Sequence, residues 1–366
     1  MLERINIILA HVHEGLLSWI PLHSPELKEV IDDWFLQNPL PAIALVAGTC
    51  KAAGGNPEDT KSLQVMTALL AQIISMDILN DYNKKNNRSG LWLKIGAERA
   101  MHYSHMLQVL FGKLCISLDE DNVIAKPVLN KFRESLLVVM SASNRTVLKE
   151  IPTWETYWKY TEIAEAYFTG ALAEAGSELV VLRPHAVTEA CRNFGIHLGL
   201  AQHIMKEMIH FSECELQYPG NRSISLGVLY GLHCEHPHQM ELKQIVWQDH
   251  LEIQSRRVKE ILDAINTREY LIWAALKEKK QAIEIIGQFP DAAGKEFLEA
   301  FATESFKRFP AADQIENIEM AKERPLEIPK LSQDFVSEFT GTLGLEYQSI
   351  GLGIRKSIRK KPLQIN

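Results

Sequence analysis

The stretch from residue 194 to residue 211 carries polar side chains at spacings that could support chemistry. Positions i, i+3, i+4 and i+7 lie within about one third of the circumference of an α-helix. In this stretch they are occupied by His203, Lys206, Glu207 and His210, which we call the polar stripe. The other positions are mainly apolar, and burying a polar group without a partner is costly. The polar stripe therefore faces either solvent or an interior cavity.

Two other groups of residues could face the same cavity. Asp77 and Asp81 lie on one predicted helix, and His102 and His105 lie on the next. Together with the polar stripe they would form a mixed histidine and carboxylate site, which suits Zn²⁺ or iron better than Mg²⁺. The alternative is that the histidines are hydrogen-bonded to the carboxylates and to Asn80 and close a cavity that binds no metal. We favour this alternative, because the pattern does not fix a ligand geometry.

The composition argues against several classes of function. The chain has 366 residues, a formal net charge of −7 and an isoelectric point near 6.0, whereas binding to nucleic acid requires a basic face. Its five cysteines show no C-x-x-C spacing, which indicates a reduced, cytoplasmic protein. No apolar run reaches the ~18 residues of a membrane span. The N-terminus has no basic region before its short apolar run, so we expect no signal peptide.

Long helices must position these residues, because alternating strand patterns are nearly absent from the sequence. Residues 179–182 are the only short strand candidate. The predicted helices cover residues 1–36 with a break near Pro21, 42–53, 60–82, 92–117, 123–141, 154–181, 194–211, 223–232, 241–265, 268–288 and 292–306. Long helices joined by short loops predict an all-α fold.

The order of these segments resembles the trans-prenyl diphosphate synthases, or polyprenyl synthetases, over about residues 25–309. Residues 42–58, A-I-A-L-V-A-G-T-C-K-A-A-G-G-N-P-E, are similar to an apolar helix, double glycine and turn of that family. Residues 73–90 stand where the family has its first aspartate-rich motif and a following R-R-G. Residues 194–210 stand where it has F-G-x-x-L-G-x-A-F-Q-x-x-D-D-x-x-D. Residues 268–308 are similar to its closing helices.

The resemblance implies a fold and a domain organisation. We expect an isoprenoid synthase-type helical bundle around a central cavity over residues 1–309, forming a homodimer as the family does. A C-terminal extension follows over residues 310–366, and it ends in a basic tail. We interpret this tail as solvated or as clasping a second subunit. The alternative is contact with an anionic membrane surface, which the five cations of residues 355–361 could support at roughly 1 kcal/mol each.

This chain departs from the family at its charged positions. Three Mg²⁺ ions hold the substrate diphosphate in the family, and the carboxylates of two D-D-x-x-D motifs hold the ions. The first motif aligns here with M-D-I-L-N (residues 76–80) and the second with K-E-M-I-H (residues 206–210). A cation at Lys206 repels a metal ion, since unit charges at about 4 Å in an effective dielectric of about 20 interact by roughly 4 kcal/mol, and a divalent ion doubles this. We therefore expect no ordinary three-magnesium ionisation.

The resemblance also assigns roles to residues of this chain. The positions that correspond to catalytic residues are Asp77, Asp81, Glu207 and Lys206, the last of which could contact a diphosphate oxygen directly. The positions expected to bind substrate are Arg88, Lys84, Lys85, Asn80, His203, His210, His102 and His105. Any Mg²⁺ would be held by Asp77, Asp81 and Glu207, and Mg²⁺ is doubtful for the reason just given.

Three functions are compatible with these features. The first is an atypical class I isoprenoid enzyme, a transferase of a divergent kind, that binds a prenyl or prenyl diphosphate-type ligand in the bundle cavity. The second is a non-catalytic partner or regulatory subunit that forms a heterodimer with an active prenyl synthase. The third is a metal-dependent enzyme that uses the histidine and carboxylate site with Zn²⁺ or iron. The sequence does not separate the first from the second.

Overall fold

The computed structural model describes residues 2–20, 24–38, 42–83, 91–121, 123–145, 152–212, 224–248 and 254–307. All of these lie within one compact unit, Met1–Leu326. The predicted domain boundary at residue 309, the C-terminal extension of residues 310–366 and its basic tail lie outside the described residues.

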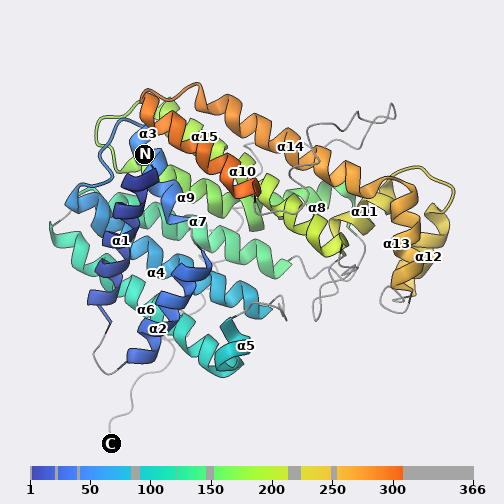
Figure 1. Ribbon diagram of the computed structural model, residues 1–366, viewed down its shortest axis with the longest axis horizontal. Helices are drawn as coiled ribbons and strands as arrows, with labels where there is room; N and C mark the ends of the chain where they lie inside the picture. Colours follow the sequence, from blue (N-terminus) through green and yellow to red (C-terminus); the bar gives the residue numbers. More distant parts are fainter. Residues whose placement is uncertain are drawn as a thin grey trace, which may run out of the picture. The chain divides into compact units, whose positions relative to one another are not determined.

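The described residues form helices joined by turns and short loops (Figure 1). The helices are α1 (Leu2–Ser18), α2 (Pro25–Gln37), α3 (Ile43–Ala52), α4 (Thr60–Asn83), α5 (Leu91–Ile95), α6 (Ala97–Asp121), α7 (Ala125–Arg145), α8 (Trp154–Thr161), the π-helical turn η1 (Glu162–Ala166), α9 (Tyr167–Glu178), α10 (His185–Ser212), α11 (Leu226–His233), α12 (Gln239–Trp247), α13 (Ser255–Ala264), α14 (Thr267–Ile286) and α15 (Ala292–Lys307). Apart from an isolated bridge residue at Ile224, the described residues form no β-structure, and the all-α prediction is confirmed.

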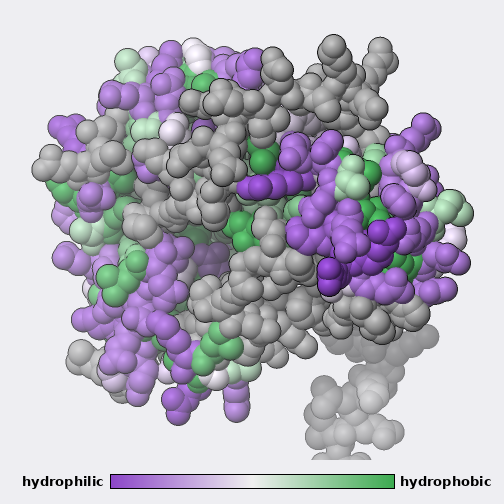
Figure 2. Space-filling model, turned by 45° about the vertical axis from the view of Figure 1, so that its right-hand side comes forward, coloured by the Kyte–Doolittle hydropathy of each residue, from purple (hydrophilic) through white to green (hydrophobic). Residues whose placement is uncertain are grey.

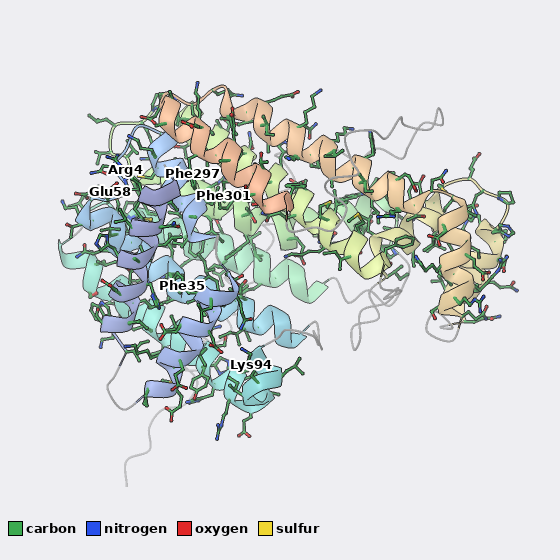
Figure 3. All side chains as sticks on the ribbon, viewed as in Figure 1. Arg4, Phe35, Glu58, Lys94, Phe297 and Phe301 are labelled. Carbon is green, nitrogen blue, oxygen red and sulfur yellow. The ribbon has the colours of Figure 1, made fainter. Side chains whose placement is uncertain are left out.

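Helix α3 lies in the core of the described bundle. Every one of its residues except Lys51 is buried, and it packs against α1, α4, α9 and α15. Small residues make this packing close, because a Cβ on Gly48 would overlap the ring of Phe297 from α15, and a Cβ on Gly176 of α9 would overlap the backbone of α3. Phe297 and its neighbour Phe301 lie along this side of α15 (Figure 3).

Helix α4 is the one described helix that is long and apolar enough to cross a membrane, judged by length and composition. Within the fold, 78% of its apolar window is buried, so packing in the core accounts for its composition. The hydroxyls of Ser75 on α4 and Ser104 on α6 lie 2.9 Å apart, and each hydroxyl donates to the other residue's carbonyl oxygen at 3.1 Å. These bonds fix the register between α4 and α6.

Four predicted helices differ from the observed ones. The single helix predicted over residues 92–117 was wrong, because α5 ends at Ile95 and α6 begins at Ala97, with Gly96 at a φ of +86° between them. The helix predicted over residues 154–181 is interrupted by η1, where the backbone makes one wider turn. The helix predicted to begin at residue 194 begins at His185. The single helix predicted over residues 241–265 was wrong, because α12 ends at Trp247 and α13 begins at Ser255. Hydrophilic side chains gather over the end of the bundle that carries α12 and α13 (Figure 2).

Candidate functional site

Helix α10 carries the polar stripe and packs closely against η1 and α9. A Cβ on Gly199 would lie 2.9 Å from the Cα of Ala166, and a Cβ on Gly195 would lie 2.7 Å from the Cα of Gly170. Real Cβ atoms do not approach backbone atoms that closely, so both positions require a residue without a side chain. Gly199 therefore allows the backbone of α10 to meet η1, and Gly195 allows it to meet α9.

This close approach places acids of η1 beside histidines of α10. The Oε2 atom of Glu165 lies 4.0 Å from Nδ1 of His203. Glu162, at the other end of the turn, lies near His197 and Glu278, and burial, as the largest cause, raises the pKa of the Glu162 carboxyl to about 7. His197 in turn lies 2.7 Å from Glu278 of α14, measured from Nδ1 to Oε2. Single π-turns inside α-helices often occur at functional sites.

His203 is buried between two helices that precede it in the sequence. Its Nε2 atom lies 3.1 Å from the hydroxyl oxygen of Tyr157, which belongs to α8. Burial, followed by the negative charge of Glu207, raises the pKa of the Tyr157 phenol well above its ordinary value of 10.0. Tyr157 is therefore protonated at neutral pH, and its hydroxyl shares a hydrogen bond with Nε2 of His203 whose direction follows the tautomer of the imidazole. Glu165, His203 and Tyr157 form a chain of polar groups that we call the Glu–His–Tyr chain.

Glu207 is the most buried of the described side chains of the polar stripe, with 1% of its surface exposed. Its Oε2 atom accepts a hydrogen bond of 2.7 Å from the backbone N–H of Leu226. Leu226 is the first residue of α11, whose N-cap Ser225 accepts a second bond from Val228 at 3.4 Å. The first N–H groups of a helix have no partner inside the helix, and a negative charge there also stabilises the helix dipole. Glu207 therefore acts as a capping group for α11.

Of the other two members of the polar stripe, the structure describes the side chain of Lys206 only. The side chain of Lys206 is exposed, since neighbouring residues on a helix point about 100° apart and Glu207 points inward. The side chain of His210 lies outside the described residues. Of the four predicted positions, the structure thus places His203 and Glu207 together in the interior and Lys206 on the surface.

The first-motif helix, α4, places Asp77 against α2. The Oδ2 atom of Asp77 accepts a hydrogen bond of 3.1 Å from the indole nitrogen of Trp34. Asn80 and Asp81 continue α4, but their side chains lie outside the described part of the chain, and so do the predicted substrate-binding residues Lys84, Lys85 and Arg88. Their predicted roles stay predictions.

The two histidines of α6 lie on its exposed face. His102 and His105 flank Ser104, which is fully buried against α4. Positions next to a buried residue on a helix point away from it, so the histidines are turned outward while His203 is buried. Within the described residues, no group of three or more His, Cys, Asp or Glu side chains is arranged to hold a metal ion.

The similarity of this chain to known proteins is found by comparing structures. No protein-family model and no curated protein matches the sequence. The heptaprenyl diphosphate synthase of Staphylococcus aureus superposes with a TM-score of 0.69 at 16% identity, over 83% of this chain and 98% of that chain. The decaprenyl diphosphate synthase of Rhodobacter capsulatus gives 0.66 at 13%, over 84% and 97%. This chain has the trans-prenyl synthase fold.

A further structure with the trans-prenyl synthase fold is similar over the same length. It is the polyprenyl synthase of Caulobacter crescentus CB15 complexed with calcium and isoprenyl diphosphate, with a TM-score of 0.61 at 16% identity, over 84% of this chain and 98% of that chain. Because sequence identity is low in all three cases, the likeness concerns the fold. What the site does must be argued from its own residues.

The residues that this chain places in the trans-prenyl synthase fold do not fit a magnesium cluster on α10. Mg²⁺ requires several hard oxygen ligands in near-octahedral geometry. The described second-motif positions offer one carboxylate, Glu207, which is bonded to Leu226, and one exposed cation, Lys206. The neighbouring imidazole of His203 is bonded to Tyr157.

Sequence reasoning missed three residues of this site. Tyr157 lies 46 residues before its partner His203, Glu165 belongs to a π-turn that periodicity cannot show, and Trp34 lies 43 residues before Asp77. The family motifs pointed to one partner of each pair only. The signal that could have drawn attention to Tyr157 and Glu165 is the unusual density of polar and aromatic residues in the segment of residues 154–168, W-E-T-Y-W-K-Y-T-E-I-A-E-A-Y-F.

Proposed function

We propose that the protein is a divergent polyprenyl synthetase-like protein of cytoplasmic isoprenoid metabolism. It binds a prenyl or prenyl diphosphate-type ligand within the helical bundle and does not carry out ordinary three-magnesium chain elongation. The observation that carries this proposal is the hydrogen bond from the N–H of Leu226 to Glu207. It gives one oxygen of the only carboxylate of the second motif a structural partner.

The cost of releasing Glu207 supports the proposal. If Glu207 turned away to coordinate a metal ion, the N–H of Leu226 would be left buried without its acceptor, which costs about 1–3 kcal/mol. The metal would gain only one ligand in return, because the neighbouring position is Lys206 and points outward. A metal site that depends on Glu207 would therefore have to compete with the stability of α11.

The environment of Asp77 supports the same conclusion for the first motif. The carboxylate already accepts a hydrogen bond from the indole of Trp34, and it is half-buried beside α2. A single carboxylate with that contact binds Mg²⁺ weakly unless further acids join it. Asp81, the only other acid of this motif region, is the residue on which magnesium binding at α4 would depend.

The experiment that tests this function separates binding from ionisation. Purified protein is titrated with farnesyl diphosphate by calorimetry, with and without Mg²⁺, and release of inorganic diphosphate is assayed in parallel. An active trans-prenyl synthase is the positive control for the release assay. We expect saturable binding that Mg²⁺ does not strengthen and no release of diphosphate. Magnesium-dependent release at the rate of the control enzyme would refute the proposal.

A second candidate function is supported by the exposed face of α6. Val109 is 74% exposed and Ile116 is 71% exposed, and their spacing of seven residues puts them on one face, together with His102 and His105. A Cβ on Gly112 of the same face would meet no atom within 4 Å. Exposed apolar side chains in a row favour contact with another protein surface. We therefore also propose a homodimer, or a heterodimer in which the protein is a non-catalytic partner of a related synthase.

Co-purification with an active prenyl synthase tests this second function. The two proteins are co-expressed with an affinity tag on the synthase only. The molar mass of the purified complex is then measured by size exclusion with light scattering. A stoichiometric complex supports the partner function. A homodimer that stays intact in the presence of the synthase argues against the heterodimer and supports self-association.

A further inference from the structure

A second group of titratable side chains meets at the first residue of η1, apart from the Glu–His–Tyr chain. It consists of Glu162 of η1, His197 of α10 and Glu278 of α14, which we call the acid–histidine cluster. Helix α10 packs against both η1 and α14, and His197 interacts with both acids. The cluster thus connects three elements that are far apart in the sequence.

The carboxylate of Glu278 is held in one position. Its Oε2 atom lies 2.7 Å from Nδ1 of His197, and a hydrogen bond of this length needs one proton between the two atoms whichever tautomer the ring adopts. With its amide oriented to satisfy its hydrogen bonds, Gln281 donates to the same oxygen at 3.2 Å. Only 4% of Glu278 is exposed. The carboxylate therefore cannot turn into solvent without leaving both contacts.

The charge of the cluster depends on Glu162. Burial, as the largest cause, raises the pKa of its carboxyl to about 7. His197 lowers this pKa and Glu278 raises it further, and no charged side chain of the other described helices packed against η1, which are α7, α8 and α9, adds to these causes. Tyr270, which Glu278 also affects, stays protonated because burial raises the pKa of its phenol. Near neutrality Glu162 therefore changes between a neutral acid and an anion.

We propose that the acid–histidine cluster is a pH-sensitive latch that holds α14 against α10 and η1. When Glu162 is protonated, the cluster contains one carboxylate and the imidazole, and the three elements stay together. When Glu162 loses its proton to solvent, a second negative charge arises in a half-buried site, and like charges at short range repel each other. Because Glu278 is fixed on α14, movement of α14 away from η1 relieves the repulsion.

The latch affects the candidate functional site because α14 also supports α11. The ring of Tyr270 on α14 stacks on that of Tyr230 on α11, with 4.0 Å between the centroids and 8° between the planes. Leu226, at the start of α11, is the residue whose N–H bonds to Glu207. Movement of α14 would therefore loosen the helix that Glu207 caps. This inference is independent of any ligand, because it rests on contacts within the chain.

Hydrogen–deuterium exchange followed by mass spectrometry tests the latch in the full-length protein. Exchange of α14 peptides is measured between pH 5 and pH 8 in the wild type and in Glu162→Gln, which cannot ionise. The ratio of the two rates at one pH cancels the intrinsic pH dependence of exchange. We expect this ratio to rise by about tenfold or more between pH 5 and pH 7 and to level off above pH 7.

Urea distinguishes the latch from a change in global stability. Exchange by local opening depends little on urea, whereas exchange through global unfolding accelerates steeply with it. The rates are therefore also measured at urea concentrations below the unfolding transition, and we expect the ratio for α14 to be independent of urea. A ratio that does not change with pH overturns the latch. A pH dependence found only in urea-dependent exchange also overturns it.

Two conservative variants test the partners of Glu162, each compared with the same variant carrying Glu162→Gln. His197→Gln removes the group that favours the ionised form, so the pH at which the ratio levels off should rise by about one unit. Glu278→Gln removes the opposing charge and should lower that pH by about one unit. Glu284→Gln, an exposed acid of α14, should leave it unchanged. A purely structural role does not move this pH, so the absence of opposite shifts overturns the assignment.

Discussion

The carboxylate of Glu207 and the backbone N–H of Leu226 are joined by a hydrogen bond of 2.7 Å. This contact connects α10, where the family holds metal, to the first residue of α11. Glu207, for which the resemblance predicts a catalytic role, thus makes a contact that stabilises α11. The consequences can be measured as stability, independently of any ligand.

Replacement of Glu207 should destabilise the protein. Glu207→Ala leaves the N–H of Leu226 without its acceptor, and we expect the free energy of unfolding to fall by about 1–3 kcal/mol. Urea denaturation followed by circular dichroism measures this change. The control is Lys206→Ala, which alters the exposed neighbour and should change stability by less than about 0.5 kcal/mol. Similar losses in the two variants would show that the hydrogen bond does not contribute.

Glu162 should make stability depend on pH. Burial raises the pKa of its carboxyl from 4.5 to about 7 in the folded protein, so the folded state binds this proton more tightly than the unfolded state. The stabilisation is complete below pH about 4.5 and is lost as the pH rises through about 7. Glu162→Gln mimics the protonated carboxyl, so its stability relative to the wild type should increase between pH 5 and pH 8 by ~3 kcal/mol.

The measurement for Glu162 is a series of urea denaturation curves at pH 5, 6, 7 and 8 for both proteins. The control is Glu284→Gln, which removes an exposed acid from α14 and should run parallel to the wild type. If the stability difference between Glu162→Gln and the wild type is constant over this pH range, the carboxyl does not titrate near neutrality.

Two glycine substitutions should have opposite effects. A Cβ on Gly199 would lie 2.9 Å from the Cα of Ala166, so Gly199→Ala forces α10 and η1 apart and should destabilise the protein by about 1–3 kcal/mol. A Cβ on Gly112 of α6 would meet nothing within 4 Å, so Gly112→Ala should stabilise its helix by up to about 1 kcal/mol. Thermal denaturation measures the unfolding temperature of both variants. Changes of opposite sign support the packing argument, whereas changes of the same sign would indicate a general effect of introducing alanine.

The exposed face of α6 should control association. If the wild type is a homodimer, size exclusion with light scattering will give twice the chain mass of 41.5 kDa. Val109→Glu places a charge in the apolar row and should shift the protein to the monomer. The control is Val123→Glu, which changes an apolar residue that is 87% exposed outside α6 and should leave the dimer intact. Unchanged mass in Val109→Glu would locate the interface elsewhere.

Elemental analysis tests the metal-dependent alternative. The described residues hold no group of three or more metal-ligating side chains, and Glu207 is bonded to Leu226. We expect purified protein to contain neither Zn nor Fe above trace amounts, and chelator treatment to leave its unfolding temperature unchanged. Stoichiometric metal that is retained after dialysis would support the metal-dependent alternative. Asp81 and His210 would then be the candidate ligands.

The sequence predicted the fold well because the relevant signals are local. Helices α2 and α4 follow from apolar periodicity with Pro25 at the first turn of α2, and the pair Gly195 and Gly199 marks the close contact of α10 with its neighbours. The segment order then identified the trans-prenyl synthase fold, which the solved structures confirm.

The site was harder to predict because its contacts join distant segments. That Glu207 caps α11, and that Trp34 bonds to Asp77, depends on how whole helices pack, and no local pattern encodes it. The sequence pattern does not indicate the π-turn either, because residues 154–181 are predicted as one continuous helix. The sequence also did not predict that His102 and His105 are exposed. An alignment shows which helix a residue belongs to, but it does not show which side of that helix faces the interior.

The π-turn η1 adds one residue to what would otherwise be a single α-helix from α8 to α9. One residue corresponds to a rotation of about 100°. The turn therefore sets the azimuth of α8 relative to α10, and so it decides which side chain of α8 faces the imidazole of His203. Deleting one residue of η1 other than Glu165 would rotate Tyr157 away and bring a neighbouring position of α8 into its place, while Tyr157, Glu165 and His203 all remain in the sequence.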